Sequence, residues 1–133
     1  MKESIPLTWR RIPERYRLIG VKCETCGKCY FPPRSLCPKC RRKGKITEVQ
    51  FSGKGKVHSH TTIYSAVSGF EDQVPYVIAI VELEEGAKVL GQVVDCNPED
   101  VKIGAKVKKV FREIQRDDPE GLIHYGFKFK LAK

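Results

Sequence analysis

Five cysteines in the segment CETCGKCYFPPRSLCPKC, residues 23–40, constrain the fold of this chain more than any other feature. Four of them form two C-x-x-C pairs, Cys23 with Cys26 and Cys37 with Cys40, and ten residues separate the pairs. The tight turn of a C-x-x-C pair brings both thiolates to one ion, and two such pairs complete a tetrahedral, all-thiolate zinc site. The spacing therefore predicts a structural Zn²⁺ bound by these four residues.

The fifth cysteine, Cys29, leaves other assignments open. The run from Cys23 to Cys29 also fits the C-x-x-C-x-x-C of a bacterial-type ferredoxin, which needs a fourth cysteine followed by proline. Cys37 does precede Pro38, but it lies eight positions after Cys29, and Cys40 would be unused. We therefore favour zinc over iron–sulfur and interpret Cys29 as a small residue packed beside the site. Adjacent C-x-x-C pairs without a signal peptide argue against disulfides.

Composition and charge bound the class of protein. The chain has 133 residues, 41% hydrophobic and 31% charged, which suits one compact soluble unit or two small ones. Its N-terminal segment lacks the apolar core of a signal peptide, so we expect a cytoplasmic protein. Residues 1–48 hold 13 Lys and Arg and 4 Asp and Glu, a net charge of +9, whereas residues 49–133 hold 12 of each. The basic half could meet phosphates of a nucleic acid or a nucleotide-bearing cofactor, or it could be a solvated surface.

The chain divides into an N-terminal helical arm (1–19), a zinc ribbon (20–46) and an all-β remainder (47–133). In the arm, Thr8 is the expected cap of a short helix, and Pro13 suits the first position of a second helical turn. Trp9, Ile12 and Tyr16 recur at helical spacing and predict one apolar face. That face packs either on the chain's own domain or on a partner.

The remainder predicts five strands and one helical turn. The first strand contains Gly53 and Gly55, which indicate a bulge, and the fourth is predicted to be bulged. Alternation in the last strand directs its odd-numbered residues, Ile123 to Leu131, toward the core. Three strands, a helical turn and two strands are the order of an OB-fold, a five-stranded Greek-key barrel. The predicted strands are 49–64, 74–83, 87–95, 106–115 and 122–131, with the turn at 97–104.

No catalytic set is apparent in the sequence, which has no Gly-rich phosphate loop, H-E-x-x-H or nucleophile elbow. His58 and His60 share a predicted strand face without an evident third metal ligand. Cys96 is more typical of packing, and the acidic segment 117–120 of a turn. Zinc held by four cysteines has no open position for water, so we expect a protein that is not an enzyme.

One non-enzymatic interpretation is binding of single-stranded nucleic acid. OB-folds of that kind stack bases on aromatic residues in a groove lined by positive charge. Here the second and third predicted strands offer one aromatic residue, Tyr76, and the predicted barrel is neutral. Nucleic-acid binding therefore stays the alternative.

Several segments resemble a known family. CETCG at 23–27, FPPR at 31–34 and CPKC at 37–40 are similar to the signature of the zinc-ribbon/OB-fold family of acyl-CoA-associated proteins. The arm WRRIPERY at 9–16 and the run VKIGAKVKKVF at 101–111 match it as well. The resemblance implies a helical arm, a rubredoxin-like zinc ribbon and an OB-fold that can take acyl-CoA.

The resemblance also implies a function and partners. It indicates a non-catalytic scaffold that binds an acetoacetyl-CoA thiolase and a hydroxymethylglutaryl-CoA synthase of the mevalonate pathway. Arginines of the basic half could then pair with the phosphates of coenzyme A, or serve only protein contacts. Phe70 has no place in the strand pattern and is a possible anchor in the loop 65–73. The candidate partner or coenzyme A contacts are Trp9, Arg10, Arg11, Tyr16, Arg34 and Phe70, with Arg17 as a further candidate for phosphate.

Overall fold

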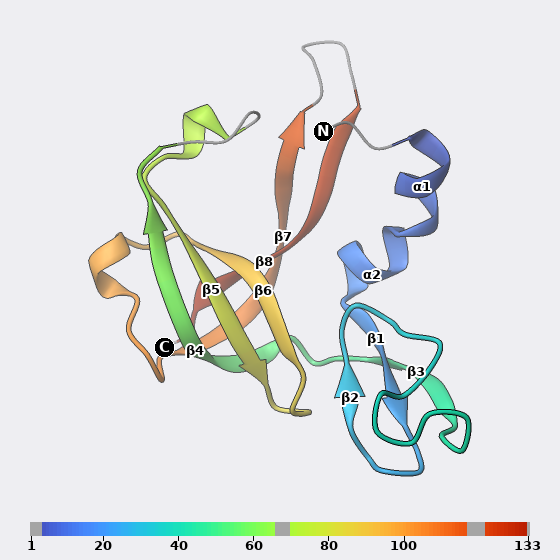
Figure 1. Ribbon diagram of the computed structural model, residues 1–133. Coiled ribbons are helices and arrows are strands. Elements are labelled where there is room, and N and C mark those ends of the chain that lie inside the picture. Colours follow the sequence, from blue (N-terminus) through green and yellow to red (C-terminus); the bar gives the residue numbers. More distant parts are fainter. Residues whose placement is uncertain (1–3, 66–69, 117–121, 133) are drawn as a thin grey trace.

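The chain folds into a helical arm, a three-stranded ribbon and a closed five-stranded barrel, and the predicted mainly β architecture is confirmed (Figure 1). The computed structural model describes residues 4–65, 70–116 and 122–132. The turn predicted at 117–120 and part of the loop 65–73 lie outside these residues. In chain order the elements are α1 (Ile5–Arg10), α2 (Ile12–Arg17), β1 (Ile19–Cys23), β2 (Cys29–Tyr30), β3 (Ile46–Gln50), β4 (Lys54–Ile63), η1 (Glu71–Gln73), β5 (Tyr76–Leu83), β6 (Lys88–Val94), η2 (Pro98–Asp100), β7 (Lys106–Arg116) and β8 (Ile123–Leu131).

The arm consists of two short helices that meet at Arg11. Ser4 caps α1, because its hydroxyl accepts a hydrogen bond from the N–H of Leu7 at 3.3 Å. The prediction that Thr8 is the cap is wrong: Thr8 lies inside α1 and its hydroxyl donates to the carbonyl of Ser4 at 3.1 Å. Pro13, expected at the first helical position, is the second residue of α2 and lies in its first turn. No helix in the described ranges is long and apolar enough to cross a membrane.

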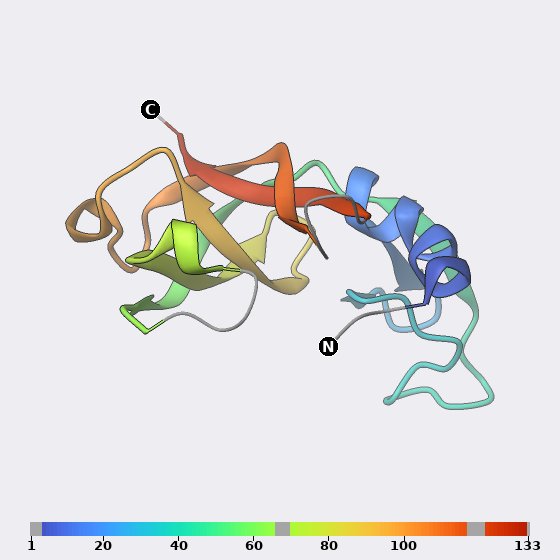
Figure 2. The ribbon, with the colours of Figure 1, turned by 90° about the horizontal axis from the view of Figure 1, so that it is seen from above.

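The predicted apolar face of the arm is divided between the barrel and solvent. The ring of Tyr16 meets Phe111 of β7 edge-on at 5.0 Å between centroids, and Phe111 in turn stacks on Tyr125 of β8 at 5.6 Å. Trp9, one helix earlier, is 75% exposed. Seen from above, the arm lies beside the β7–β8 hairpin, at the same end of the molecule as the ribbon (Figure 2). Tyr16 therefore fixes α2 to the barrel and leaves α1 outside.

The ribbon sheet has the order β2-β1-β3, with both pairs antiparallel. Its third strand corrects the prediction of one long strand over 49–64. Val49 pairs with Gly20 and Gln50 with Ile19, so these residues close the ribbon, and β4 begins only at Lys54. Gly53 separates the two strands with a left-handed backbone, φ +81°.

The barrel has the strand order β4-β5-β6-β8-β7, which is that of an OB-fold. It closes where Lys54–Lys56 pair with Lys106–Lys108, and β6 runs parallel to β8. The bulge predicted at Gly53 or Gly55 lies instead between Val57 and Ser59, whereas the bulge predicted in β7 is present between Glu113 and Gln115. The helical turn expected at 97–104 is the short 3-10 helix η2, and Gly104 serves the turn before β7 rather than ending the helix.

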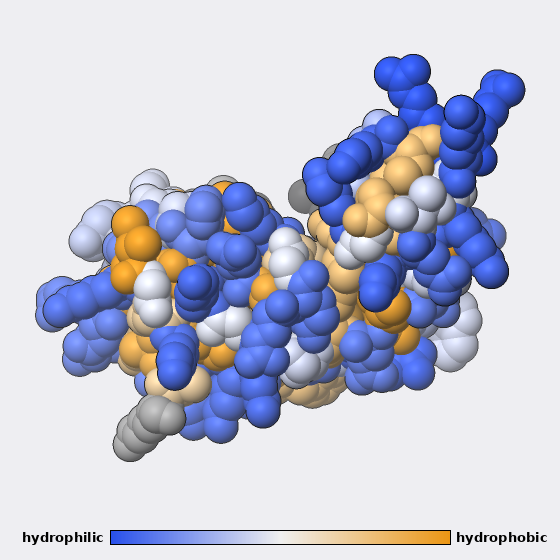
Figure 3. Space-filling view, turned by 90° about the horizontal axis from the view of Figure 1, so that it is seen from below, coloured by the Kyte–Doolittle hydropathy of each residue, from blue (hydrophilic) through white to orange (hydrophobic). Residues whose placement is uncertain are grey.

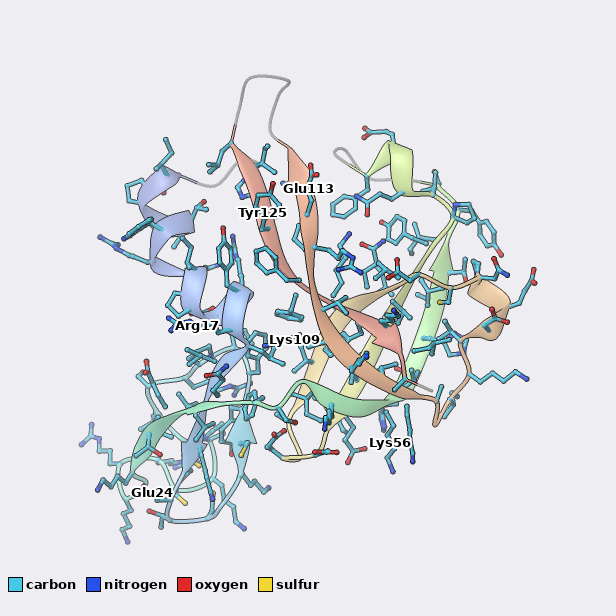
Figure 4. The ribbon with its side chains drawn as sticks, turned by 180° about the vertical axis from the view of Figure 1, so that it is seen from behind. Arg17, Glu24, Lys56, Lys109, Glu113 and Tyr125 are labelled. Atoms are coloured by element: carbon cyan, nitrogen blue, oxygen red, sulfur yellow. The ribbon has the colours of Figure 1, made fainter. Side chains whose placement is uncertain are left out.

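The core lies inside the barrel and continues toward the ribbon. Phe129 of β8 is fully buried, and a Cβ on Gly91 of β6 would lie 2.6 Å from its ring, so the strands can approach only with glycine there. The prediction that the odd-numbered residues of β8 face the core holds for Phe129 but not for Tyr125, which is 37% exposed. The even-numbered residues His124 and Lys128, which were expected to face solvent, are buried. The β7–β8 hairpin extends beyond the barrel, and Figure 4 shows Tyr125 and Glu113 on its two strands.

Candidate functional site

The four cysteines of the two C-x-x-C pairs come together in the ribbon. The sulfur atoms of Cys23, Cys26, Cys37 and Cys40 all lie within 4.8 Å of one another, and the Cys26 and Cys37 sulfurs are 3.6 Å apart. Zinc–sulfur bonds of about 2.3 Å place the sulfurs of a tetrahedral site about 3.8 Å apart. Among the described residues this is the one group with the geometry of a metal site. It would be closed by four thiolates, so a metal there is structural.

Two similar turns hold the pairs. The N–H of Gly27 donates to the carbonyl of Cys23 at 2.7 Å, and the N–H of Arg41 donates to the carbonyl of Cys37 at 2.7 Å. Gly27 and Arg41 follow the second cysteine of each pair, and both have left-handed backbones, with φ of 77° and 54°. This conformation turns the chain away from the sulfurs after each pair.

Tyr30 of β2 stabilises a thiolate in the cluster. Its hydroxyl lies 3.5 Å from the Cys37 sulfur. This hydrogen bond and that from the N–H of Cys40 are the main causes that lower the pKa of Cys37 to about 6. The same contact with Cys37, together with burial, raises the pKa of Tyr30 to about 12. Burial among the other thiols raises the pKa of Cys40 to about 12. Four thiolates this close together repel one another, so a cation at their centre is needed to keep all four deprotonated. The donor set therefore fits Zn²⁺.

Gly44 completes the site and was missed by sequence reasoning. A Cβ at this position would lie 2.9 Å from the Cβ of Cys40, 3.1 Å from the sulfur of Cys23 and 3.2 Å from the Cβ of Cys37. The backbone of Gly44 thus packs directly against the cluster, where any side chain would displace a ligand. Its place in the basic segment RRKGK carries no signal of this contact.

The other candidate ligands and nucleophiles lie apart from the cluster. Cys29 and Cys96 are each half-buried against the core, and burial raises the pKa of both thiols. His58 and His60 are exposed on β4, and the Nδ1 atom of His58 is 3.9 Å from a carboxylate oxygen of Glu82. Within the described ranges, no third ligand joins the two histidines.

The candidate contact residues are distributed over three parts of the molecule. On the arm, Trp9, Arg10 and Arg11 are exposed, and Tyr16 is half-buried on the barrel. On the ribbon, the guanidinium of Arg34 lies 5.2 Å from the centroid of the Tyr30 ring, so it is partly engaged by its own module. Hydrophilic side chains project from the ribbon end of the molecule (Figure 3).

The third part of the molecule with a candidate contact residue is the barrel, where Phe70 lies directly before η1. Its ring is 5.7 Å from that of Tyr76, which is 8% exposed. Tyr76 is the one aromatic residue of β5 and β6, so these strands present no exposed ring on which a base could stack. β5 and β6 therefore lack the exposed aromatic residues with which OB-folds bind single-stranded nucleic acid.

Comparison with protein families gives two matches. The family model described as the ChsH2 rubredoxin-like zinc ribbon domain matches residues 10–45, and the ChsH2 C-terminal OB-fold domain matches residues 48–112. The first match contains the four clustered cysteines. The second covers β4 to β6 and part of β7.

Similar proteins include archaeal relatives of comparable length. The chain is 58% identical over 123 residues to a DUF35 domain-containing scaffold protein of Methanocaldococcus jannaschii, covering 92% of this chain and 87% of that protein. It is 50% identical over 122 residues to one of Pyrococcus furiosus, covering 92% and 88%. A probable enoyl-CoA hydratase alpha subunit of Thermomonospora curvata is 32% identical over 100 residues, which are 74% of this chain but 30% of that protein.

Among solved structures, the chain is similar to one described as Ltp2-ChsH2(DUF35) aldolase. The TM-score is 0.72 at 28% identity, and the match covers 100% of this chain and 98% of the other. A protein of unknown function from the DUF35 family of Sulfolobus solfataricus shares the fold, with a TM-score of 0.54 at 24% identity.

Proposed function

Because the chain belongs to the DUF35 family of zinc-ribbon and OB-fold proteins, we propose that it is a non-catalytic scaffold that joins two enzymes of acyl-CoA metabolism. We assign these enzymes as an acetoacetyl-CoA thiolase and a hydroxymethylglutaryl-CoA synthase of the mevalonate pathway, following the family resemblance of the arm and ribbon segments. The relatives described as scaffold proteins support the role, since they align over nearly the whole chain. We place the scaffold in the cytoplasm, where thiolates stay reduced.

The observation that carries the proposal is the exposed apolar surface of α1. Ile5 and Trp9 are 73% and 75% exposed, although α2 is fixed to the barrel through Tyr16. Trp9 therefore lies on a short helix whose neighbour is fixed, and a large aromatic side chain in such a place is an effective anchor for a partner protein. Arg10 and Arg11 beside it add charge for an acidic partner or for the phosphates of coenzyme A. We propose α1 as the thiolase- or synthase-binding element.

The zinc ribbon gives this arm its support. We propose that Cys23, Cys26, Cys37 and Cys40 bind one Zn²⁺, which replaces the hydrophobic core that so small a module cannot form. α2 continues through Leu18 directly into β1, and Leu18 is buried in the main core. The metal therefore stabilises the base from which the arm projects.

A scaffold with no catalytic activity of its own would be useful to a thiolase and a synthase that act in succession. The condensation of two acyl thioesters by a thiolase is unfavourable, so a second enzyme must remove the product. Holding the two enzymes together raises the effective concentration of each for the other. The scaffold needs only two dissimilar surfaces for this role, and we propose the arm and the neutral barrel as those surfaces.

The test is recovery of partners from native lysate with the purified full chain. We expect a thiolase and a synthase to be captured by the unaltered chain. We expect the W9A variant to bind the arm's partner about thirtyfold more weakly, as for a central aromatic anchor. Ile103→Ala is a matched control, because Ile103 is 73% exposed but lies in the turn before β7. Capture of neither enzyme from cells that contain both would contradict the proposal.

A further inference from the structure

A large apolar cleft lies on the outer face of the barrel. Its volume is about 690 Å³, which is in the range of sites for small molecules. The outward-facing residues Ile78 of β5 and Leu90 of β6 contribute to the lining, together with Phe70 and Tyr76 on one side and the β7–β8 hairpin on the other. The cleft that these described residues form is therefore lined mostly by hydrocarbon.

One cation is buried in the lining of this cleft. Lys128 of β8 is 5% exposed, and its ammonium donates to the side-chain oxygen of Gln73 at 3.0 Å. That oxygen also accepts a hydrogen bond from the amide of Gln92 at 3.1 Å, and the amide of Gln73 donates to the carbonyl of Ile114 at 3.2 Å. Two further glutamine contacts therefore hold the acceptor in place beside the ammonium.

The charge of Lys128 is poorly compensated. An ammonium has three N–H donors, and in the described part of the chain it meets one neutral acceptor and no carboxylate within ion-pair distance. Glu113 and Arg112 act on it with opposite sign from further away. Burial accordingly lowers the pKa of Lys128. A buried cation is costly unless an anion pairs with it.

We infer that the cleft binds an aliphatic carboxylic acid, with its chain on Ile78 and Leu90 and its carboxylate on the ammonium of Lys128. The hydrocarbon lining selects an apolar chain, since its burial is the main source of affinity. The buried ammonium of Lys128 selects a negative head group, because a charge-assisted hydrogen bond is about twice as strong as a neutral one. Gln92, which also lines the cleft, is a second donor near that head group.

The experiment titrates the isolated full chain with octanoate and with octan-1-ol, two probes that share the eight-carbon chain and differ in head group. Binding is followed by amide NMR shifts and by calorimetry. We expect octanoate to bind about tenfold or more tightly than octan-1-ol, with the largest shifts at Phe70, in β5 and β6 and in the β7–β8 hairpin, which line the cleft. In Lys128→Met the two probes should bind equally, whereas Ile78→Trp should obstruct both.

Lys109→Met is the matched control. Lys109 is half-buried, and burial lowers its pKa as it does that of Lys128. It lies on β7 outside the cleft, so octanoate affinity should not change. Equal binding of the two probes by the unaltered chain, or no binding of octanoate, would overturn the inference. Because this comparison uses only the unaltered chain, it tests the inference even if a variant fails to fold. No partner enzyme is present, so the result does not depend on the scaffold role.

Discussion

Replacing Cys37 with serine is expected to release the metal and unfold the ribbon while the barrel stays folded. Cys37 is fully buried, and its sulfur is the one that accepts from both Tyr30 and the N–H of Cys40. Structural zinc in small modules contributes on the order of 10 kcal/mol or more to folding, which no packing in a ribbon of this size can replace. The barrel closes through β4 and β7 without the ribbon. Elemental analysis should give about one zinc per unaltered chain and almost none in the variant.

Cys29→Ser is the control for this prediction. Cys29 lies on β2 outside the sulfur cluster, so the variant should keep its zinc and the NMR dispersion of the ribbon. The assignment would be contradicted by a Cys37→Ser protein that retains zinc. It would equally be contradicted by visible iron–sulfur absorbance that disappears in Cys29→Ser.

Gly44→Ala should weaken metal binding strongly although it adds one methyl group. The new Cβ would have to share space with the Cβ atoms of Cys37 and Cys40 and the sulfur of Cys23. Because all three belong to ligands, the methyl group can be accommodated only if the sulfur cluster expands. Overpacking of this kind costs about 1–3 kcal/mol, which corresponds to a loss of roughly five- to 150-fold in zinc affinity. Competition with a chromophoric chelator measures it.

Gly27→Asn distinguishes crowding from backbone strain. Gly27 needs a left-handed backbone, φ +77°, but a Cβ there would meet nothing within 4 Å. Asparagine tolerates that conformation, so this variant should bind zinc nearly as well as the unaltered chain. Equal loss in both variants would mean that the effect at Gly44 does not arise from contact with the ligands.

The sequence predicts best where the signal is local. The C-x-x-C spacing brings four sulfurs together because each pair is set by its own turn. The succession along the chain of three strands, a helical turn and two strands, which is typical of an OB-fold, also follows from the pattern of apolar runs. Gly44 could not be found in this way, because the crowding around it comes from cysteines 4, 7 and 21 positions away that meet only in the folded ribbon.

Partners far along the chain explain the other errors. Val49 and Gln50 have the residue types of a continuing strand, but they pair with β1, about thirty residues earlier. In β8, alternation suggests a polar face at His124 and Lys128, yet Gln73, 55 positions before Lys128, contacts its ammonium on that face. Periodicity shows which side chains share a face of a strand, and it does not show whether another segment covers that face.

The most direct test of the scaffold role is sedimentation of purified thiolase and synthase with and without this chain. We predict that the two enzymes sediment as one complex when the unaltered chain is present and as separate species when it is left out or lacks residues 4–11. Two enzymes that sediment together without the chain, or separately in its presence, would contradict the role proposed here.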